Sequence, residues 1–240
     1  MLESWETYHA IREVIANAID EQSLTQTKDI EIFQDKQKSW HIRDYGRGLK
    51  YEHLPQKEND EKLSHPDLIG KFGVGLKDAL ATFDRKKIEV VVKSRFGDIT
   101  LDKSEKSDFK DIVTLHACIS APSETQLVGT DFVLLGSSAD DMQKAKALFL
   151  KFSREKVIEK TQFGEVLSKS SSSANIFING VKVAEEENFL FSYNITSLTA
   201  TIKKGTQPRK NERRQNRICR SRQINSPFMP RERRRSSARR

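Results

Sequence analysis

The most informative stretch of this sequence is Ile69-Gly70-Lys71-Phe72-Gly73-Val74-Gly75-Leu76-Lys77-Asp78, in which three glycines within six residues lead directly into a helical pattern. Glycine lacks a Cβ atom, so the backbone N–H groups of such a stretch can approach an anion closely. The N-terminus of the following helix adds unpaired donors and a partial positive charge. The stretch therefore predicts a phosphate-binding loop. The alternative is a purely structural turn before a helix.

Upstream of this stretch, residues 8–21 have the periodicity of an amphipathic helix. One side is apolar and carries Ile11, Val14, Ile15 and Ala18. The opposite side carries Glu13, Asn17 and Asp20, whose spacing places them on one helix face. Two carboxylates and an amide in this arrangement can hold a hydrated metal ion and activate a water molecule. The alternative is a polar face exposed to solvent.

Between these two segments, residues 29–34 and 39–43 have the pattern of two short strands joined as a hairpin. The second strand is followed by Asp44-Tyr45-Gly46-Arg47-Gly48. An aspartate at the end of a strand can point its carboxylate at a planar ligand, and the two glycines let that ligand approach the bare backbone. A simple turn is the alternative interpretation.

The remaining segments predict a mixed α/β chain. Residues 49–68 are polar, contain two prolines and predict a mobile connection. One helix is expected to continue from the glycines to about residue 83, and another is expected at 139–152. Strands are expected at 87–93, 98–103, 111–119, 129–135, 175–178 and 181–183, with Asn179-Gly180 as the turn between the last two.

The charge of the 240-residue chain is unevenly distributed. The formal net charge is +8, but residues 201–240 contain 15 Lys and Arg against 2 Asp and Glu, a net of +13. Residues 1–200 therefore carry a net charge of −5. The sequence thus predicts a mildly acidic domain followed by a basic tail.

Cysteine content and hydropathy exclude several classes of protein. The only cysteines, Cys118 and Cys219, are far apart, which excludes a disulfide framework and a cysteine metal site and fits a reducing compartment. No apolar run reaches the roughly 18 residues of a membrane span. The acidic N-terminus lacks the apolar core of a signal peptide. We therefore expect a cytoplasmic protein that does not engage a membrane.

The separate motifs become informative in combination. In order, they are Glu13-x-x-x-Asn17-Ala18-x-Asp20, Asp44-x-Gly46-x-Gly48, Gly70-x-x-Gly73-x-Gly75-Leu76-Lys77, and Gly129-Thr130 entering a strand. This order and spacing resemble the ATP-binding domain of the gyrase, heat-shock chaperone, histidine kinase and MutL (GHKL) superfamily. The resemblance implies a two-layer α/β sandwich, the Bergerat fold, with helices on one face of a mixed, mostly antiparallel sheet. The domain would span residues 1–200, with residues 49–69 as the lid over ATP.

The resemblance also implies a role for each matching residue around the adenine and the metal. Asn17 would coordinate the Mg²⁺ that bridges the ATP phosphates, which suits an amide oxygen. Asp44 would accept a hydrogen bond from the adenine amino group, and Thr130 would support Asp44. Gly46 and Gly48 would let the base lie against the backbone.

The third motif is implied to hold the phosphates. The residues concerned are Gly70, Gly73, Gly75, Leu76 and Lys77. The glycines would form the cradle, whereas Lys77 would contact phosphate or lie on the helix surface, two alternatives that the sequence leaves open. Asp20 is expected to brace the pocket rather than take part in chemistry.

Glu13 favours a branch within the superfamily. Hydrolytic members carry a glutamate here that polarises the attacking water, whereas histidine kinases have a different residue. The resemblance therefore implies a slow Mg²⁺-dependent ATPase with Glu13 as general base. The branch it implies is that of the chaperone and MORC-like enzymes. In such a protein the lid rearranges with the nucleotide, or the subunits of an assembly such as a homodimer do. Such relatives complete the site with Lys or Arg from a transducer domain, which is not evident here. A nucleotide-gated binding module without hydrolysis and a histidine-kinase-type catalytic domain are the alternatives.

The basic tail has three interpretations. Clustered Lys and Arg favour a nucleic-acid-binding arm, and the same composition is typical of a disordered segment. The third interpretation is a frameshift, because a shift of one nucleotide permits Lys204 to Ser226 to be translated as a mixed-charge segment that resembles bacterial relatives of this fold. On that interpretation the tail from residue 203 is dispensable for ATP binding and the transducer domain has been lost.

Overall fold

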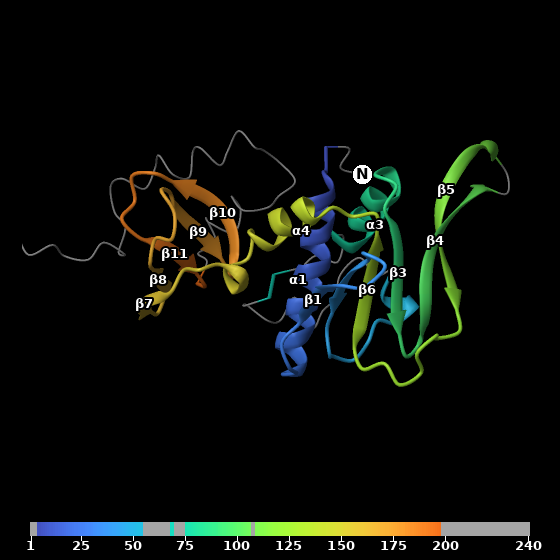
Figure 1. Cartoon of the computed structure of the whole chain (residues 1–240), viewed down its shortest axis with the longest axis horizontal. Coiled ribbons are helices and arrows are strands. Elements are labelled where there is room, and N and C mark those ends of the chain that lie inside the picture. The colour runs from blue at the N-terminus through green and yellow to red at the C-terminus, as the bar shows by residue number, and fades with distance from the viewer. Residues whose placement is uncertain (1–3, 55–67, 70–74, 107–108, 198–240) are drawn as a thin grey trace, which may run out of the picture. The chain divides into compact units, whose positions relative to one another are not determined.

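The computed structural model describes residues 4–54, 68–69, 75–106 and 109–197 (Figure 1). Met1–Thr196 group as one compact unit. The predictions for Gly70, Gly73, most of the lid and the tail 201–240 lie outside the described residues.

Helix α1 (Thr7–Thr25) buries the apolar side that the sequence predicts. Ile11, Val14 and Ile15 are completely buried and belong to one core with side chains from the neighbouring strands. Gln26 adopts a left-handed conformation with φ 53° and ends the helix. The helix contacts α3 (Gly75–Arg85), α4 (Ala139–Lys146) and one strand of the first sheet.

The first sheet has six strands in the order β1-β2-β6-β3-β4-β5. Their bounds in that order are Glu31–Gln34, Trp40–Arg43, Thr130–Leu135, Glu89–Ser94, Gly97–Lys106 and Phe109–Ser120. Every pair of neighbours is antiparallel. Because β6 pairs with both β2 and β3, it brings residue 130 beside the end of β2, where Asp44 follows.

One face of this sheet is covered by helices. A row of apolar residues crosses the neighbouring strands β2, β6, β3 and β4, in that order: Ile42, Phe132, Val92 and Ile99. All four are buried in the same core as Ile11. Alternate residues of a strand point to opposite faces, so this row lies on the side where α1 contacts β2 and α3 contacts β3. The predicted fold class, a two-layer α/β sandwich with a mostly antiparallel sheet, is confirmed.

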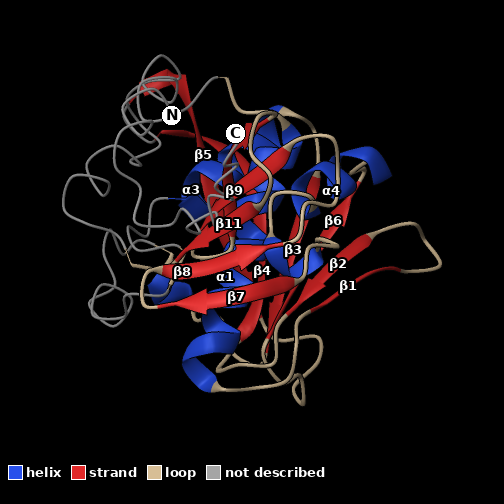
Figure 2. Cartoon of the chain, turned by 90° about the vertical axis from the view of Figure 1, so that its left-hand side faces the viewer, coloured by secondary structure: helices blue, strands red, loops and turns tan. Residues whose placement is uncertain are grey.

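A second sheet follows, with the strand order β10-β9-β11-β8-β7. Figure 1 labels all five strands, and Figure 2 shows β7, β8, β9 and β11 from another side. The strands, in chain order from β7 to β11, are Val157–Thr161, Gly164–Leu167, Ala174–Ile178, Val181–Glu186 and Ser192–Ile195. The pair β11 and β9 is parallel, and the other pairs are antiparallel. The predicted Asn179-Gly180 turn joins β9 to β10, and both of its residues have positive φ. Positive φ at both positions suits a tight hairpin.

The helix predicted at 139–152 is too long. The structure ends α4 at Lys146, and only a single 3-10 turn, Leu150–Phe152, follows. Phe149 between them is extended and forms a bridge with Val181, while Lys182 N donates a 2.8 Å hydrogen bond to Leu148 O. This pairing with the β9–β10 turn, together with burial of the Phe149 ring, outweighs the helical periodicity.

Among the described helices, none is long and apolar enough to cross a membrane.

Candidate functional site

Two of the polar residues predicted on one face of helix α1, Glu13 and Asp20, lie against Gly75 and Ile69. Asn17 donates its amide nitrogen to the Glu13 carbonyl oxygen at 2.9 Å, which directs the amide oxygen away from the helix backbone. Asp20 is 1% exposed, and its Oδ1 accepts a 2.8 Å hydrogen bond from Ile69 N. Because Ile69 directly precedes the glycine-rich stretch, Asp20 ties α1 to the start of that stretch.

The Glu13 carboxylate lies against the beginning of α3. A Cβ atom placed on Gly75, the first residue of α3, would overlap this carboxylate, so a larger residue there would require the Glu13 side chain to move. Arg12 forms an ion pair with Glu13. Leu76 is partly buried against the core, and Lys77 is exposed. The structure thus brings Glu13 together with Gly75.

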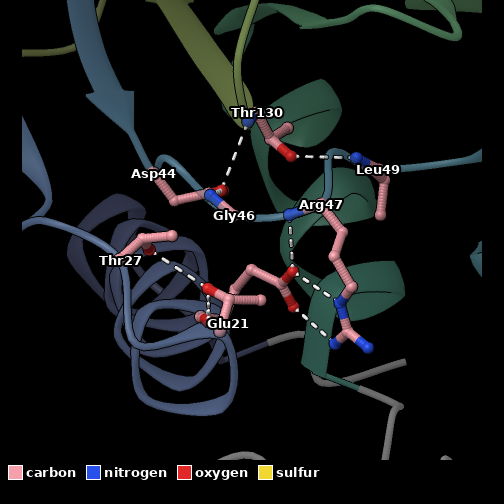
Figure 3. Close-up of polar contacts among 8 residues, drawn as sticks. Glu21, Thr27, Asp44, Gly46, Arg47, Leu49 and Thr130 are labelled. Carbon is pink, nitrogen blue, oxygen red and sulfur yellow. Dashed lines mark hydrogen bonds and ion pairs between the residues drawn. The ribbon is translucent and has the colours of Figure 1, made fainter.

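Asp44 is a buried carboxylate at the end of β2 (Figure 3). Its Oδ1 accepts hydrogen bonds from Gly46 N at 2.9 Å and from Thr130 N at 3.3 Å. Asp44 N in turn donates to Thr130 O at 3.0 Å. Neither of these two backbone hydrogen bonds uses Oδ2. The geometry therefore fixes the carboxylate through one oxygen and leaves the other able to accept a hydrogen bond from a ligand.

Burial, together with the smaller effect of the Glu21 charge, raises the pKa of Asp44 from its ordinary 3.8 to about 6. The hydrogen bonds from Gly46 and Thr130 act in the opposite direction, since they stabilise the ionised form. A carboxyl group whose pKa is higher in the folded state than in the unfolded state favours folding when protonated. Its contribution is complete below pH 3.8 and is lost as the pH rises through about 6.

This pKa predicts a pH-dependent difference in stability between the wild type and Asp44→Asn. The difference between 3.8 and about 6 corresponds to about 3 kcal/mol. We therefore expect the unfolding free energy of the wild type, relative to Asp44→Asn, to fall by about 3 kcal/mol between about pH 4 and pH 7. Urea denaturation of both proteins across this range measures the difference. A difference independent of pH would show that Asp44 titrates as an ordinary solvated carboxyl group.

Glycines let the segments around Asp44 meet backbone to backbone. Gly129 has φ +83°, and a Cβ atom there would overlap the carbonyl group of Asp44. Gly48 has φ +86°, and its added Cβ would lie 3.1 Å from the Gly129 carbonyl oxygen. A Cβ on Gly46 would overlap the Glu21 side chain. These close approaches explain why glycine occupies all three positions.

Thr130 supports the loop in a way that the sequence did not specify. Its backbone holds Asp44, whereas its Oγ1 accepts a 2.9 Å hydrogen bond from Leu49 N. The Leu49 carbonyl oxygen accepts a further 2.7 Å hydrogen bond from Ser94 Oγ. The side chain of Thr130 therefore positions the segment after Gly48, and its hydrogen bonding to the Asp44 carboxylate also favours the ionised form of Asp44.

The ion pair between Glu21 and Arg47 was not predicted from the sequence. Glu21 Oε1 accepts hydrogen bonds from the N and Nε atoms of Arg47, and Oε2 accepts one from Nη2, each at 2.9 Å (Figure 3). This bidentate pair fixes the Asp44–Gly48 loop to the last turns of α1. One signal was available: Glu21 follows Asn17 by four residues and therefore shares its helix face.

Comparison with known proteins gives a matching family model, similar protein sequences and similar solved structures. The family model described as the Mycoplasma pneumoniae MPN635 N-terminal domain matches residues 140–223. An uncharacterized protein of Mycoplasma pneumoniae (strain ATCC 29342 / M129 / Subtype 1) is 37% identical over 211 residues, which cover 85% of this chain and 84% of that protein.

Two solved structures are also similar. The 43K ATPase domain of Thermus thermophilus gyrase B, in complex with an aminocoumarin, shares 14% identity over 73% of this chain and 61% of that chain, with a TM-score of 0.36. The ATP-binding domain of topoisomerase IV from Francisella tularensis, in complex with a small-molecule inhibitor, shares 18% identity with this chain. The match covers 72% of this chain and 62% of that chain, with a TM-score of 0.34. This chain therefore spans less than two thirds of either solved chain.

Proposed function

We propose that this chain, which belongs to the same protein family as the 37% identical Mycoplasma pneumoniae protein, binds ATP through Asp44. The observation that carries this proposal is the buried carboxylate whose Oδ1 is held by two backbone N–H groups, neither of which uses Oδ2. An exocyclic amino group satisfies such an oxygen. The glycines at 46 and 48 leave backbone without side chains beside it, where a planar base can lie.

Mg²⁺ is proposed to bind through Asn17 together with the ATP phosphates. The described residues contain no cluster of three or more His, Cys, Asp or Glu side chains that could hold a metal ion. A site with one protein oxygen ligand, completed by phosphates and water, is the usual arrangement for Mg²⁺ with nucleotides. The Asn17 amide fits this role because its nitrogen is committed to the Glu13 carbonyl. Mg²⁺ would neutralise phosphate charge.

Slow hydrolysis with Glu13 as general base is the proposed activity. The position of the Glu13 carboxylate against Gly75 supports it, because the N-terminus of α3 is where phosphate would bind. A glutamate on α1 would place the protein on the hydrolytic branch, near the chaperone and MORC-like ATPases, in which nucleotide state drives lid or subunit rearrangement. A transducer domain supplying Lys or Arg would accelerate turnover.

A nucleotide-gated binding module without hydrolysis is the second candidate. The ion pair between Arg12 and Glu13 favours it, because the guanidinium occupies a carboxylate oxygen that would otherwise accept a hydrogen bond from water. In this case ATP would still bind and the lid would still respond. Turnover, rather than binding, separates the two candidates.

The choice of nucleotide tests the binding proposal. Guanine presents a carbonyl oxygen where adenine has its amino group, and that oxygen would face the Asp44 carboxylate without a hydrogen bond between them. An unpaired buried acceptor costs about 1–3 kcal/mol, so we expect Mg²⁺-GTP to bind at least about fivefold more weakly than Mg²⁺-ATP. Calorimetric titration of the full chain with each nucleotide at neutral pH measures the ratio. Equal affinities would show that Asp44 does not contact the base.

A further inference from the structure

The outer edge of β5 is open in the described part of the chain. In Figure 1 the β4–β5 hairpin ends the first sheet, and none of the described strands pairs with β5 on its other side. Residues 116–120 are exposed, and Ile119 is 50% exposed. Backbone N–H and C=O groups of an edge strand point alternately toward the neighbouring strand and away from it. This edge can therefore accept another strand.

Residues 114–120 lack the protection that edge strands usually carry. Edge strands commonly carry charged side chains that prevent pairing with another molecule. The sequence Thr-Leu-His-Ala-Cys-Ile-Ser contains no Asp, Glu, Lys or Arg. The strands at the other three sheet edges do contain them: Glu31 in β1, Glu159 and Lys160 in β7, and Lys182, Glu185 and Glu186 in β10. β5 carries Lys110 and Asp111 near its start, so it differs from the other edges in the long uncharged run that follows them.

The apolar core extends to this edge, where its last residue, Ile119, remains partly exposed. Ile119 stands opposite Ile99, which in turn stands opposite Val92, and both of these are buried under the helices. Ile119 therefore continues a buried row but remains half exposed. Leu115, Ala117 and Ile119 alternate along β5, so they share one face of the sheet. An apolar residue placed beside Ile119 would complete the row.

We propose that a second copy of this chain pairs with β5 through its own β5, in antiparallel register centred on Ala117. The run is symmetrical about Ala117: Leu115 and Ile119 are both apolar, and Thr114 and Ser120 are both small hydroxyl residues. In this register Ile119 stands opposite the partner's Leu115, and each Ala117 stands opposite its counterpart. The pairing would join two six-stranded sheets across a two-fold axis. It does not depend on nucleotide binding.

The expected dimer is weak. A single pair of seven-residue strands buries less than the roughly 1,600 Å² of a standard stable interface. Main-chain hydrogen bonds would supply affinity, and the matching apolar row would supply register. Sedimentation of the full chain over a range of concentrations should therefore show a reversible equilibrium between monomer and dimer.

A charge exchange at the centre of the strand tests both the surface and the register. Ala117→Lys and Ala117→Glu each place like charges opposite one another across the interface, which costs several kcal/mol, so each variant alone should dimerise at least about tenfold more weakly than the wild type. A mixture of the two should restore dimers, because Lys then faces Glu. Thr100→Lys, at an exposed position of β4 inside the sheet, serves as the matched control and should dimerise like the wild type.

Thermal melting of each variant shows whether it folds, and position 117 is exposed enough to tolerate either side chain. A monomeric wild type, or an undiminished dimer in Ala117→Lys, would overturn the proposal. Failure of the mixture to form dimers, when both variants fold, would overturn the register and with it the two-fold pairing.

Discussion

Replacing Glu13 by alanine should lower steady-state ATP turnover about a hundred- to ten-thousand-fold while leaving ATP binding largely intact. A positioned general base contributes a factor of this size because it acts in the transition state and not in the ground state. The structure places the Glu13 carboxylate against Gly75, beside the N-terminus of α3. Turnover measured at saturating Mg²⁺-ATP, with affinity measured separately, distinguishes the two effects.

The control for this experiment is Glu6→Ala, which removes an exposed carboxylate just before the same helix. Glu6→Ala should hydrolyse ATP like the wild type. Glu13→Gln keeps the shape of the side chain and should be as slow as Glu13→Ala. If Glu13→Ala hydrolyses as fast as its parent, Glu13 is part of a polar helix face, and the activity has another source.

Gly129→Ala is expected to destabilise the fold by about 2–5 kcal/mol. Two costs combine in this estimate: a left-handed conformation costs an alanine roughly 1–2 kcal/mol, and forcing a methyl group into packed structure costs about 1–3 kcal/mol. The new Cβ would overlap the Asp44 carbonyl group, so Asp44 must move. We therefore expect ATP affinity to fall together with stability. Urea denaturation and nucleotide titration measure the two effects.

Gly180→Ala provides the matched control, because Gly180 has φ +76° and nothing lies within 4 Å of its added Cβ. This variant carries the conformational cost alone, so it should lose only about 1–2 kcal/mol and keep its ATP affinity. Equal losses in the two variants would show that the contact between Gly129 and Asp44 contributes nothing beyond backbone strain.

Local sequence signals predicted the parts of the site that depend on neighbouring residues. The Asp44-x-Gly46 pattern predicts a carboxylate at a strand end, and the structure places it there with the Gly46 N–H bonded to it. The helical spacing of Glu13, Asn17 and Asp20 likewise predicts a shared face. Their proposed roles in binding and hydrolysis remain predictions, since they concern a ligand.

Long-range pairing explains what the sequence did not reveal. Glu21 and Arg47 are 26 residues apart, so their ion pair depends on how the loop after β2 docks on α1. Strands β7 and β8 were not predicted, because all five residues of β7 are exposed and give no alternating pattern. Phe149 was placed in a helix by periodicity, yet its pairing with Val181 draws it into an extended conformation.

The most direct test of the account is titration of Mg²⁺-ATP into the wild type and Asp44→Asn at neutral pH. The Asn carbonyl oxygen would take over the hydrogen bonds from Gly46 and Thr130, so its amide group would face the adenine amino group, donor against donor. Asp98→Asn, which changes another buried aspartate of the same sheet, is the control and should bind like the wild type. We predict that Asp44→Asn loses about 1–3 kcal/mol of binding free energy, a weakening of about 5- to 150-fold. Equal affinity in the wild type and Asp44→Asn would contradict the account.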